Sequence, residues 1–505
     1  MTTPGLWHQL QKLGGAVALY MTLGLLLAAP SHASDAALEY GRDGVVKNGT
    51  VQTRIGELTF ENGYPSRESV ASLYDAMDFQ RATQAYVWAL PMVSMAEWQA
   101  VHEQQFNAQD RDFVIYNTTE EKLGILTANA TTPYVIAFND LGRSGPLVIE
   151  VPSGPVGGLV NDFWQRPVTD LGLAGPDQGA GGKYLVLGPG QEQPEGIEID
   201  HVVTSDTMNI LVGIRILTPD PQEADRILRA FRVYPAADPD EEQGYAEVKG
   251  EWFHYQPRGL DYWQRLHSVY EREPVAERDR FMLASLRFLG MEKGQPFNPT
   301  ERQRELLAEA TLVGEAMAQA NSFESRFPGV QYRDDSSWEY VIFLEPSQRE
   351  GEHEHLDERA AYSYEAVTTS AGMTTTTPGV GSAYLGGYRD GDGDWLSGSS
   401  TYKLTIPADA PMKQFWSVSV YDQATRCLIN NGTERADRSS RHDLVTNADG
   451  SVDLYFGPET APEGMENNFI RTNAGDGFFV YFRLYAPTEP YFEKSWPLPD
   501  LKKIN

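Results

Sequence analysis

Polar and aromatic residues that could bind a small molecule occur in and beside the predicted loops of two β-rich regions. Tyrosine and tryptophan rings stack on sugar rings and other amphipathic ligands, while amide and charged groups orient them. The chain contains 10 Trp and 25 Tyr, so it offers many such rings. Trp164 and Trp416 are better explained as core residues, because they follow phenylalanine in the same short pattern. We predict ligand-binding candidates at Asn129, Tyr134, Arg166, Asp170, Lys183, Trp395, Tyr421 and Arg426.

Two carboxylates of the first region allow an alternative, enzymatic interpretation. Asp170 or Asp177 could act as a general base, while Arg166 or Lys183 stabilises negative charge in a hydrolase or lyase. Asp170 would then lie in a pocket with a perturbed pKa. A purely structural pair between Arg166 and Asp170 is the alternative. The sequence contains neither a G-x-S-x-G nor an H-E-x-x-H motif, so ligand binding remains the favoured interpretation.

Two short segments contain residue types that bind metals, and these residues are His353, His355, Asp390, Asp392 and Asp394. The histidines could face one side of a strand, but a solvated acidic loop is favoured. The aspartates resemble half of a calcium loop, yet Trp395 stands where an EF-hand needs Gly and Thr401 where it needs Glu. A hairpin turn is favoured, with another kind of calcium site as the open alternative. We predict no metal centre and no cofactor.

The glycine-rich stretch TDLGLAGPDQGAGGKYLVLGPG, residues 169–190, raises the question of a phosphate-binding loop. A P-loop would need Gly where Asp177 stands and Ser or Thr where Tyr184 stands. Phosphate-binding loops also lead into a helix, whereas residues 184–187 followed by Gly188 and Pro189 predict a strand and a turn. We therefore expect a strand-connecting loop whose glycines adopt positive φ.

The two halves of the chain repeat an order of short signals. The pattern F-W-x-x-x-V-x-D occurs at 163–170 and at 415–422. Each copy is followed by a Gly-Pro turn and then by a predicted strand that carries an arginine, Arg215 or Arg483. Strands and turns keep their order while loops vary in length, so we interpret these segments as a duplicated β-domain.

The elements that position these residues are predicted to be mainly β with α additions, as two jelly-roll-like antiparallel β-sandwich domains joined by a helical middle segment. Helical spacing and start signals predict helices at 68–90, 221–231, 260–289 and about 298–320, with the first ending at Pro91. The expected parts are a signal peptide at 1–33, an N-terminal extension at 34–66, a helix with the first β-sandwich at 67–218, the helical segment at 219–365 and the second β-sandwich at 366–505.

In these segments the chain resembles exported bacterial proteins that pair two domains of unknown function, the "twelve-fifty-four" and "twelve-fourteen" types. The matching stretches are DFQRATQAY at 78–86, TANATTPY at 127–134, the glycine-rich stretch, Tyr384-Leu385, WLSG at 395–398, FWSVSVYD at 415–422 and DGSVDLYFGP at 449–458. The resemblance covers roughly residues 70–205 and 370–490. It implies paired jelly-roll-like sandwiches with helical additions, and it implies no activity and no catalytic residues.

The first 33 residues have the features of an export signal. Lys12 precedes an apolar run at 14–29, and small residues follow at the cleavage position. Cleavage is favoured over an uncleaved anchor because Pro30 breaks the run, and no other stretch is apolar enough to span a membrane. The single cysteine, Cys427, excludes an internal disulfide, suits a periplasmic or secreted protein and is expected to be buried.

The charge and composition of the chain limit the classes of partner that it could bind. The net charge is −30, and it becomes −31 without the signal's one lysine, so the chain repels nucleic acid. The leading interpretation is a protein that binds a small molecule, a glycan or an envelope component at the loops or cleft of its two domains. The carboxylate-based enzyme is the second interpretation, and a jelly-roll assembly protein that forms homo-oligomers is the third.

Overall fold

The computed structural model describes residues 39–41, 44–218, 220–433 and 435–504, and the predicted signal peptide lies outside them. The chain divides into two compact units, residues 1–76 and 77–505. Four antiparallel strands form one sheet in the first unit, and they are β1 (Glu39–Tyr40), β2 (Val46–Thr53), β3 (Gly56–Glu61) and β4 (Tyr64–Pro65). Gly56, at φ 106°, closes the β2–β3 hairpin, and the Thr53 hydroxyl donates to its carbonyl oxygen.

Helix α1 (Arg67–Gln104) continues through Pro91, so the prediction that it ends there was wrong. Proline removes one backbone donor and opens the helix locally. The buried guanidinium of Arg359 donates to the carbonyl oxygen of Trp88 at 3.1 Å, whereas the carbonyl that loses its helical donor at Pro91 is that of Val87. Residues 85–96 are buried throughout. Burial of this apolar segment outweighs the cost of the proline.

The first β-region consists of two sheets, with strand orders β11-β10-β7-β13 and β14-β5-β6-β12-β8-β9. Buried residues of both sheets, among them Ile149 and Val186 from one and Val135 and Val212 from the other, form a single apolar cluster, as in a β-sandwich. Two of its strands lie beyond residue 218. The elements are β5 (Phe113–Tyr116), α2 (Thr119–Lys122), β6 (Tyr134–Asp140), α3 (Leu141–Ser144), β7 (Leu147–Val151), β8 (Val156–Asp162), β9 (Pro167–Gly172), β10 (Gly182–Leu187), β11 (His201–Thr204), β12 (Asn209–Ile216), α4 (Pro221–Ala230), β13 (Arg232–Pro235) and β14 (Tyr245–Ala246).

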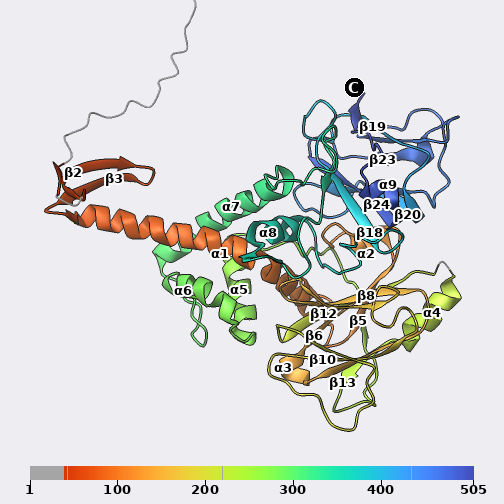
Figure 1. The fold of residues 1–505 in the computed structure, drawn as a ribbon, viewed down its shortest axis with the longest axis horizontal. Coiled ribbons are helices and arrows are strands. Elements are labelled where there is room, and N and C mark those ends of the chain that lie inside the picture. Colours follow the sequence, from red (N-terminus) through yellow and green to blue (C-terminus); the bar gives the residue numbers. More distant parts are fainter. Residues whose placement is uncertain (1–38, 42–43, 219, 434, 505) are drawn as a thin grey trace, which may run out of the picture. The chain divides into compact units, whose positions relative to one another are not determined.

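The second β-region has sheets in the orders β15-β18-β24-β20-β21 and β23-β22-β19-β25. Figure 1 shows its main strands in blue and those of the first region in orange to yellow-green. The elements are β15 (Glu339–Tyr340), β18 (Ser382–Gly387), β19 (Tyr402–Ile406), β20 (Met412–Asp422), β21 (Asp437–Ser439), β22 (Val452–Gly457), η2 (Glu466–Asn468), β23 (Phe469–Arg471), β24 (Phe478–Pro487), α9 (Glu489–Phe492) and β25 (Lys502–Lys503). The chain is thus mainly β with α additions, as predicted.

The two β-regions repeat one topology, which confirms the predicted duplication. The order β6-β12-β8-β9 corresponds to β18-β24-β20-β21, and β11-β10-β7 corresponds to β23-β22-β19. In both copies the same outer pair is parallel, β10 with β11 and β22 with β23. The Phe-Trp correspondence was wrong, because Trp416 lies within β20 whereas Trp164 follows the end of β8. The duplication is therefore shown by the repeated order of the strands and not by the short Phe-Trp pattern.

Helices fill the segment between the β-regions, and they are α5 (Leu260–Arg272), η1 (Glu277–Asp279), α6 (Arg280–Phe288), α7 (Glu301–Phe323) and α8 (Leu356–Glu365), with a small hairpin of β16 (Arg349–Glu350) and β17 (His353–Glu354). The single helix expected at 260–289 is divided near Pro274, and α8 was not predicted. Helix α7 begins with a capping box between Thr300 and Gln303, so its N-cap is Thr300 and the helix begins slightly later than the expected start at about 298. None of the helices in the described ranges combines the length and apolar character that a membrane crossing requires.

The glycine-rich stretch connects β9 to β10, as predicted. Gly172, Gly179 and Gly181 have φ of 71°, 81° and 80°, which side chains rarely adopt. A Cβ on Gly181 would also lie 2.6 Å from the carbonyl oxygen of Val151. Lys183 lies on strand β10 and not at the start of a helix. The glycines serve the backbone turn and do not form a phosphate-binding loop.

Candidate functional site between the two β-regions

A cavity of about 390 Å³ lies between the two β-regions. Its walls combine residues 125–136, β8 and β12 of the first region with residues 366–384 and β24 of the second. Gly157 and Gly158 on β8 also line it. The volume lies in the range of small-molecule sites.

Each β-region contributes an arginine and a neighbouring tyrosine to this cavity. The guanidinium carbon of Arg215, on β12, lies 5.5 Å from the ring centre of Tyr134, at the start of β6. Arg483, on β24, is paired across the sheet with Tyr384 on β18, and its guanidinium carbon lies 5.7 Å from that ring centre. Because β12 corresponds to β24 and β6 to β18, the duplication places two equivalent Arg–Tyr pairs in one cavity.

Arg215 lies between aromatic rings from both regions. Its guanidinium carbon lies 5.5 Å from the ring centre of Tyr134 in the first region and 5.8 Å from the ring centre of Tyr485 in the second. The Tyr485 ring stacks on Phe415, with ring centres 3.9 Å apart. Nε of Arg215 donates to the hydroxyl of Thr132 at 3.1 Å. The aromatic rings and this hydroxyl fix the guanidinium while leaving other donor positions for a ligand.

Arg483 is 3% exposed and binds only neutral groups. Its Nη1 donates to the Ser419 hydroxyl at 3.0 Å and its Nη2 to the carbonyl oxygen of Thr127 at 2.7 Å. Burial by itself lowers the pKa of Arg483, but the surrounding tyrosine oxygens, first that of Tyr421, outweigh burial and raise this pKa. The guanidinium therefore stays charged. Thr127 has φ 40°, an uncommon conformation for a β-branched residue, and Arg483 helps to hold it.

The cavity has an uncompensated positive charge. Arg215, Arg441 and Arg483 line it, and no aspartate or glutamate of the described ranges does so. Neither Arg215 nor Arg483 forms an ion pair among those described residues. Carboxylates outnumber basic side chains in this chain, with 71 Asp and Glu against 41 Lys and Arg, so their exclusion from the cavity is selective. A buried cation without a counter-ion is costly, and an anionic ligand removes that cost.

Tyr485 provides a further donor. This residue is 7% exposed and lines the cavity, and its hydroxyl lies close enough to Arg215 to raise the pKa of that guanidinium but has no partner in hydrogen-bonding geometry within the described residues. An unsatisfied buried hydroxyl costs free energy. A ligand oxygen in the cavity would satisfy it.

Asn129 and Tyr134, two of the predicted binding residues, lie together in the cavity wall. The backbone N–H of Asn129 and its side-chain amide both donate to the Tyr134 hydroxyl oxygen, at 3.0 and 2.7 Å. Because the oxygen already accepts two hydrogen bonds, the tyrosine proton is available to donate to a ligand. Asn129 also accepts from Thr132, which in turn binds Arg215. The local sequence TANATTPY thus builds a donor platform.

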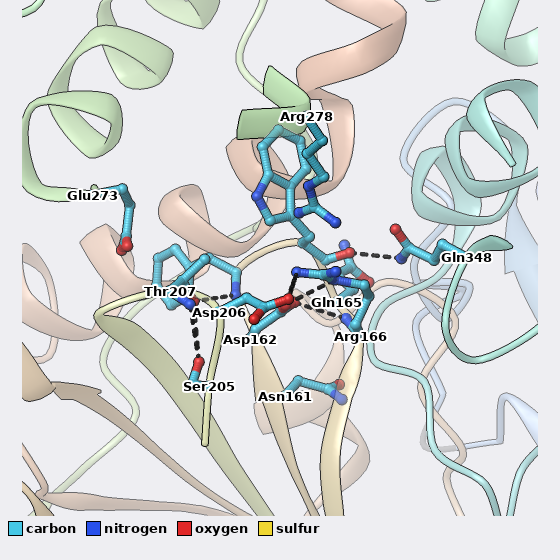
Figure 2. A network of polar contacts seen from close by, with 12 residues as sticks. Asn161, Asp162, Gln165, Arg166, Ser205, Asp206, Thr207, Glu273, Arg278 and Gln348 are labelled. Carbon is cyan, nitrogen blue, oxygen red and sulfur yellow. Dashed lines mark hydrogen bonds and ion pairs between the residues drawn. The ribbon is translucent and has the colours of Figure 1, made fainter. Parts of the chain in front are cut away.

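Arg166 belongs to a different network, which Figure 2 shows. Its Nη2 lies 2.7 Å from a carboxylate oxygen of Asp162 and 2.8 Å from one of Asp206. Arg278 approaches the ring of Trp164 from the helical segment, at 5.4 Å from the ring centre. Two carboxylates already compensate Arg166, and it is not among the residues that line the cavity. Its ion pair is structural, and the partner is Asp162 and not Asp170.

The three other charged candidates of the first region also have structural partners. Asp177 accepts from the Gly172 and Gly181 amides and from the Tyr184 hydroxyl, which closes the glycine-rich loop. Lys183 is exposed and pairs with Glu150 at 3.0 Å. Asp170 accepts from the amide of Gly372 at 2.9 Å, and its other carboxylate oxygen has no partner within the described residues.

The enzymatic interpretation required Asp170 to lie in a pocket with a perturbed pKa. Burial raises the pKa of Asp170, while the hydrogen bonds from Gly372 and Ser370 lower it, and the net shift is upward. Gly372 and Ser370 line the cavity, but Asp170 itself stands behind them. Neither Arg166 nor Lys183 reaches it by an ion pair. The arrangement does not place a base beside a cationic stabiliser.

The candidates of the second region are divided between packing and surface roles. The Tyr421 hydroxyl donates to the carbonyl oxygen of Ala128 at 2.8 Å, and so connects the β-regions. Buried Arg426 donates to the Gln256 side chain at 2.8 Å. Trp395 is 49% exposed and stacks under Arg389 at 3.6 Å. None of the three lines the cavity described above.

The residues with metal-binding side chains are arranged as turns. One Asp390 carboxylate oxygen accepts from the amides of Asp392 and Asp394, as in a tight turn. His353 is exposed on the β16–β17 hairpin, and His355 precedes α8. The described ranges hold no group of three or more His, Cys, Asp or Glu residues that could bind a metal ion. Cys427 is buried, and burial raises its pKa to about 12.

Sequence reasoning did not select Arg215, Arg483 and Tyr485 as binding residues. The available signal was the arginine that recurs in the repeated strand, which a search for motifs in loops does not detect. Both arginines lie on interior strands of their sheets, β12 and β24, and the alternation of a strand does not show which of its faces meets a cavity. Asn129 and Tyr134 were predicted from the polar and aromatic content of their loop, and the structure places both in the cavity wall.

Comparisons with known proteins match each of the two β-regions to a family model. Residues 100–235 match the family model described as "Protein of unknown function (DUF1254)", and residues 381–489 match "Protein of unknown function (DUF1214)". Arg215 lies in the first match and Arg483 in the second.

Two solved structures resemble the chain. The VPA0106 protein from Vibrio parahaemolyticus is 15% identical, with a TM-score of 0.53 over 85% of this chain and 100% of that chain, and so supports the fold. A putative uncharacterized protein from Burkholderia cenocepacia is 11% identical, with a TM-score of 0.40 over 86% and 96%. No curated protein matches significantly. The chain therefore pairs a DUF1254 domain at residues 100–235 with a DUF1214 domain at residues 381–489, both of unknown function.

Proposed function

We propose that this chain is a periplasmic or secreted binding protein that holds a small amphipathic anion in the cavity between its two β-regions. The observation that carries this proposal is the pair of equivalent arginines, Arg215 and Arg483, in a cavity that no described carboxylate lines. Guanidinium groups bind carboxylate, sulfate and phosphate groups through several N–H donors. Export rests on the signal-like residues 1–33.

The remaining walls favour a ligand with an apolar body. Leu159, Leu217 and Ile136 line the cavity together with the rings of Phe415 and Trp98. Apolar surface of this kind is buried favourably against hydrocarbon or an aromatic ring, while the arginines and the tyrosine hydroxyls orient the anionic end. Binding of a neutral glycan would leave both guanidinium groups without a counter-ion, so an anionic group is the preferred recognition element.

A matched pair of fluorescent probes tests this proposal. Anilinonaphthalene sulfonate carries an anionic group on an apolar ring system, and N-phenylnaphthylamine has similar rings without the sulfonate. We expect the native protein to bind the sulfonate more tightly, and Arg215→Gln and Arg483→Gln each to weaken that binding by roughly tenfold or more. Affinity is measured by fluorescence titration below the unfolding transition, with circular dichroism as the test of folding.

Arg229→Gln is the matched control, because it removes the same charge from the exposed surface of α4, where Arg229 pairs with Asp225. It should leave sulfonate binding unchanged. Equal affinity for the two probes, or sulfonate binding that survives in the folded Arg215→Gln and Arg483→Gln variants, would contradict the proposal.

A further inference from the structure

We propose that a second, smaller site among α7, α8 and β15 binds a single monovalent cation of about the size of a water molecule, such as potassium or ammonium. The site, called here the α7–α8 niche, is defined by Ser322 on α7, Glu339 on β15, Glu365 at the end of α8, and Tyr388. It shares the wall residues Val341 and Tyr362 with the arginine-lined cavity, but the inference does not rest on the ligand proposed there.

The size of the α7–α8 niche limits what it can hold. Its volume is about 20 Å³, which suffices for one water-sized species. A larger amine would have to leave its carbon chain outside. Divalent metals are disfavoured, because the described residues contain no group of three or more ligands of the His, Cys, Asp and Glu types in binding range of one another.

Two buried oxygen atoms of the niche lack partners. Glu365 is 2% exposed, and one of its carboxylate oxygens accepts from the Tyr388 hydroxyl at 2.8 Å. The other carboxylate oxygen and the hydroxyl of Ser322, itself 6% exposed, have no hydrogen-bond partner among the described residues. The hydroxyls of Ser322 and Tyr481 lie near enough to Glu365 to lower its pKa, but outside hydrogen-bonding geometry. A small cation between these oxygens would satisfy both.

The charge around the niche is also uncompensated. Glu339 and Glu358 line it together with Glu365, and no Lys, Arg or His of the described ranges does. Arg389, the basic side chain whose charge acts on Glu339, pairs instead with Glu324 and stacks on Trp395. Burial raises the pKa of Glu365 to about 8 and that of Glu339 to about 7, which is the response of carboxylates that lack a counter-ion.

Aromatic rings complete the surroundings of the niche and suit a weakly hydrated monovalent ion. Tyr340, Phe327 and Phe343 line it, and the last two stack with ring centres 6.2 Å apart. Ring faces attract potassium and ammonium ions, which lose their water more readily than smaller, more strongly hydrated ions. Carboxylate and hydroxyl oxygens supply the remaining contacts.

Thermal unfolding of the full chain tests this inference. The protein is melted at pH 8.5 in potassium, ammonium or tetramethylammonium chloride at equal ionic strength, since tetramethylammonium is too large for the niche. We expect a Tm about 2 °C higher in the first two salts. Glu365→Gln, which keeps the shape of the side chain, should abolish the difference, whereas Glu309→Gln, on the exposed face of α7, should retain it.

The alternative is that Glu365 simply holds a proton. In that case the native protein would melt at the same temperature in all three salts, and Glu365→Gln would be at least as stable in each. That result would overturn the cation site. So would a salt difference that persists unchanged in Glu365→Gln, because the ion would then bind elsewhere.

Discussion

Arg483 donates a hydrogen bond of 2.7 Å to the carbonyl oxygen of Thr127, although 356 residues separate the two in sequence. This bond joins the DUF1214 match to the DUF1254 match at the wall of the cavity. It holds the loop at 127–134, whose Asn129 and Tyr134 face the same space, and it fixes the guanidinium by a neutral acceptor. The contact that connects the two domains therefore also prepares an anion-binding group.

Loss of this connection should destabilise the protein. We expect Arg483→Gln to lower the free energy of unfolding by roughly 2–4 kcal/mol, because the carbonyl of Thr127 and the hydroxyl of Ser419 lose a charged donor in the interior. Arg215→Gln should cost less, since Arg215 is partly exposed. Denaturant unfolding measures both values. The expectation fails if the two variants are equally stable.

Tyr485→Phe should separate binding from stability. The Tyr485 hydroxyl lies near Arg215 but has no partner in hydrogen-bonding geometry within the described residues, so its removal should change the free energy of unfolding by less than about 1 kcal/mol. Binding of anilinonaphthalene sulfonate should weaken by about tenfold if that hydroxyl donates to the ligand.

Tyr402→Phe is the reciprocal control for that variant. The buried Tyr402 hydroxyl accepts from the Ser397 amide at 3.1 Å, and Tyr402 is not among the residues lining the cavity. This variant should lose roughly 1–2 kcal/mol of stability and keep its probe affinity. Unaltered sulfonate binding by Tyr485→Phe would remove the hydroxyl from the site.

Acid should destabilise the core through buried histidine. His254 is fully buried between the rings of Trp98 and Trp252, and burial lowers its pKa well below the usual value. The folded state keeps His254 neutral, while the unfolded chain binds a proton below about pH 6.5. Stability is therefore lost as the pH falls from about 6.5, by about 1.4 kcal/mol per pH unit for this group.

His254→Phe removes this titration and retains an aromatic ring for stacking. Unfolding by denaturant at several pH values between 6 and 4 should give a shallower loss of stability in this variant than in the native chain. Buried carboxyls such as Glu365, whose pKa is raised to about 8, act in the opposite direction in both proteins, so the comparison cancels them. Parallel pH profiles would show that His254 is not neutral in the fold.

Gly314 on α7 should not tolerate alanine. In a helix this replacement ordinarily stabilises by about 1 kcal/mol. Here the added Cβ would lie 2.6 Å from the ring of Tyr86 on α1, and that ring stacks on Tyr262. We expect Gly314→Ala to lower the free energy of unfolding by roughly 1–3 kcal/mol.

Ala316→Gly, at an exposed position of the same helix, calibrates the propensity effect and should lose about 1 kcal/mol. Gly314→Ala raises helix propensity and Ala316→Gly lowers it, yet both variants should destabilise the protein. Denaturant unfolding measures both changes. A gain in stability for Gly314→Ala would mean that α1 and α7 can separate to admit the methyl group.

The sequence predicts features whose causes are local. The glycines between β9 and β10 adopt positive φ in their own loop, as predicted. Helix α7 begins close to its expected start, although its N-cap is Thr300. Asn129 and Tyr134, five residues apart, form their hydrogen bonds within one turn. In each case the partners are close along the chain, so residue types and spacing are enough to identify the interaction.

Predictions from short sequence patterns were wrong where contacts between residues far apart in the chain determine the local structure. Pro91 remains inside α1 because the core buries the residues around it. Trp164 and Trp416 share a short pattern, yet only the strand pairing shows that they occupy different positions. Arg166 was grouped with Asp170, whereas the fold pairs it with Asp162 and Asp206.

By itself, the sequence determined the β-rich class, the duplicated order of strands and an arginine in each copy of one strand, because periodicity and turn residues record these directly. Only the tertiary structure decided that Arg215 and Arg483 face one cavity and that no described carboxylate accompanies them there. The reason is physical: burial and charge compensation depend on which surfaces meet, and that meeting is set by the packing of segments far apart along the chain.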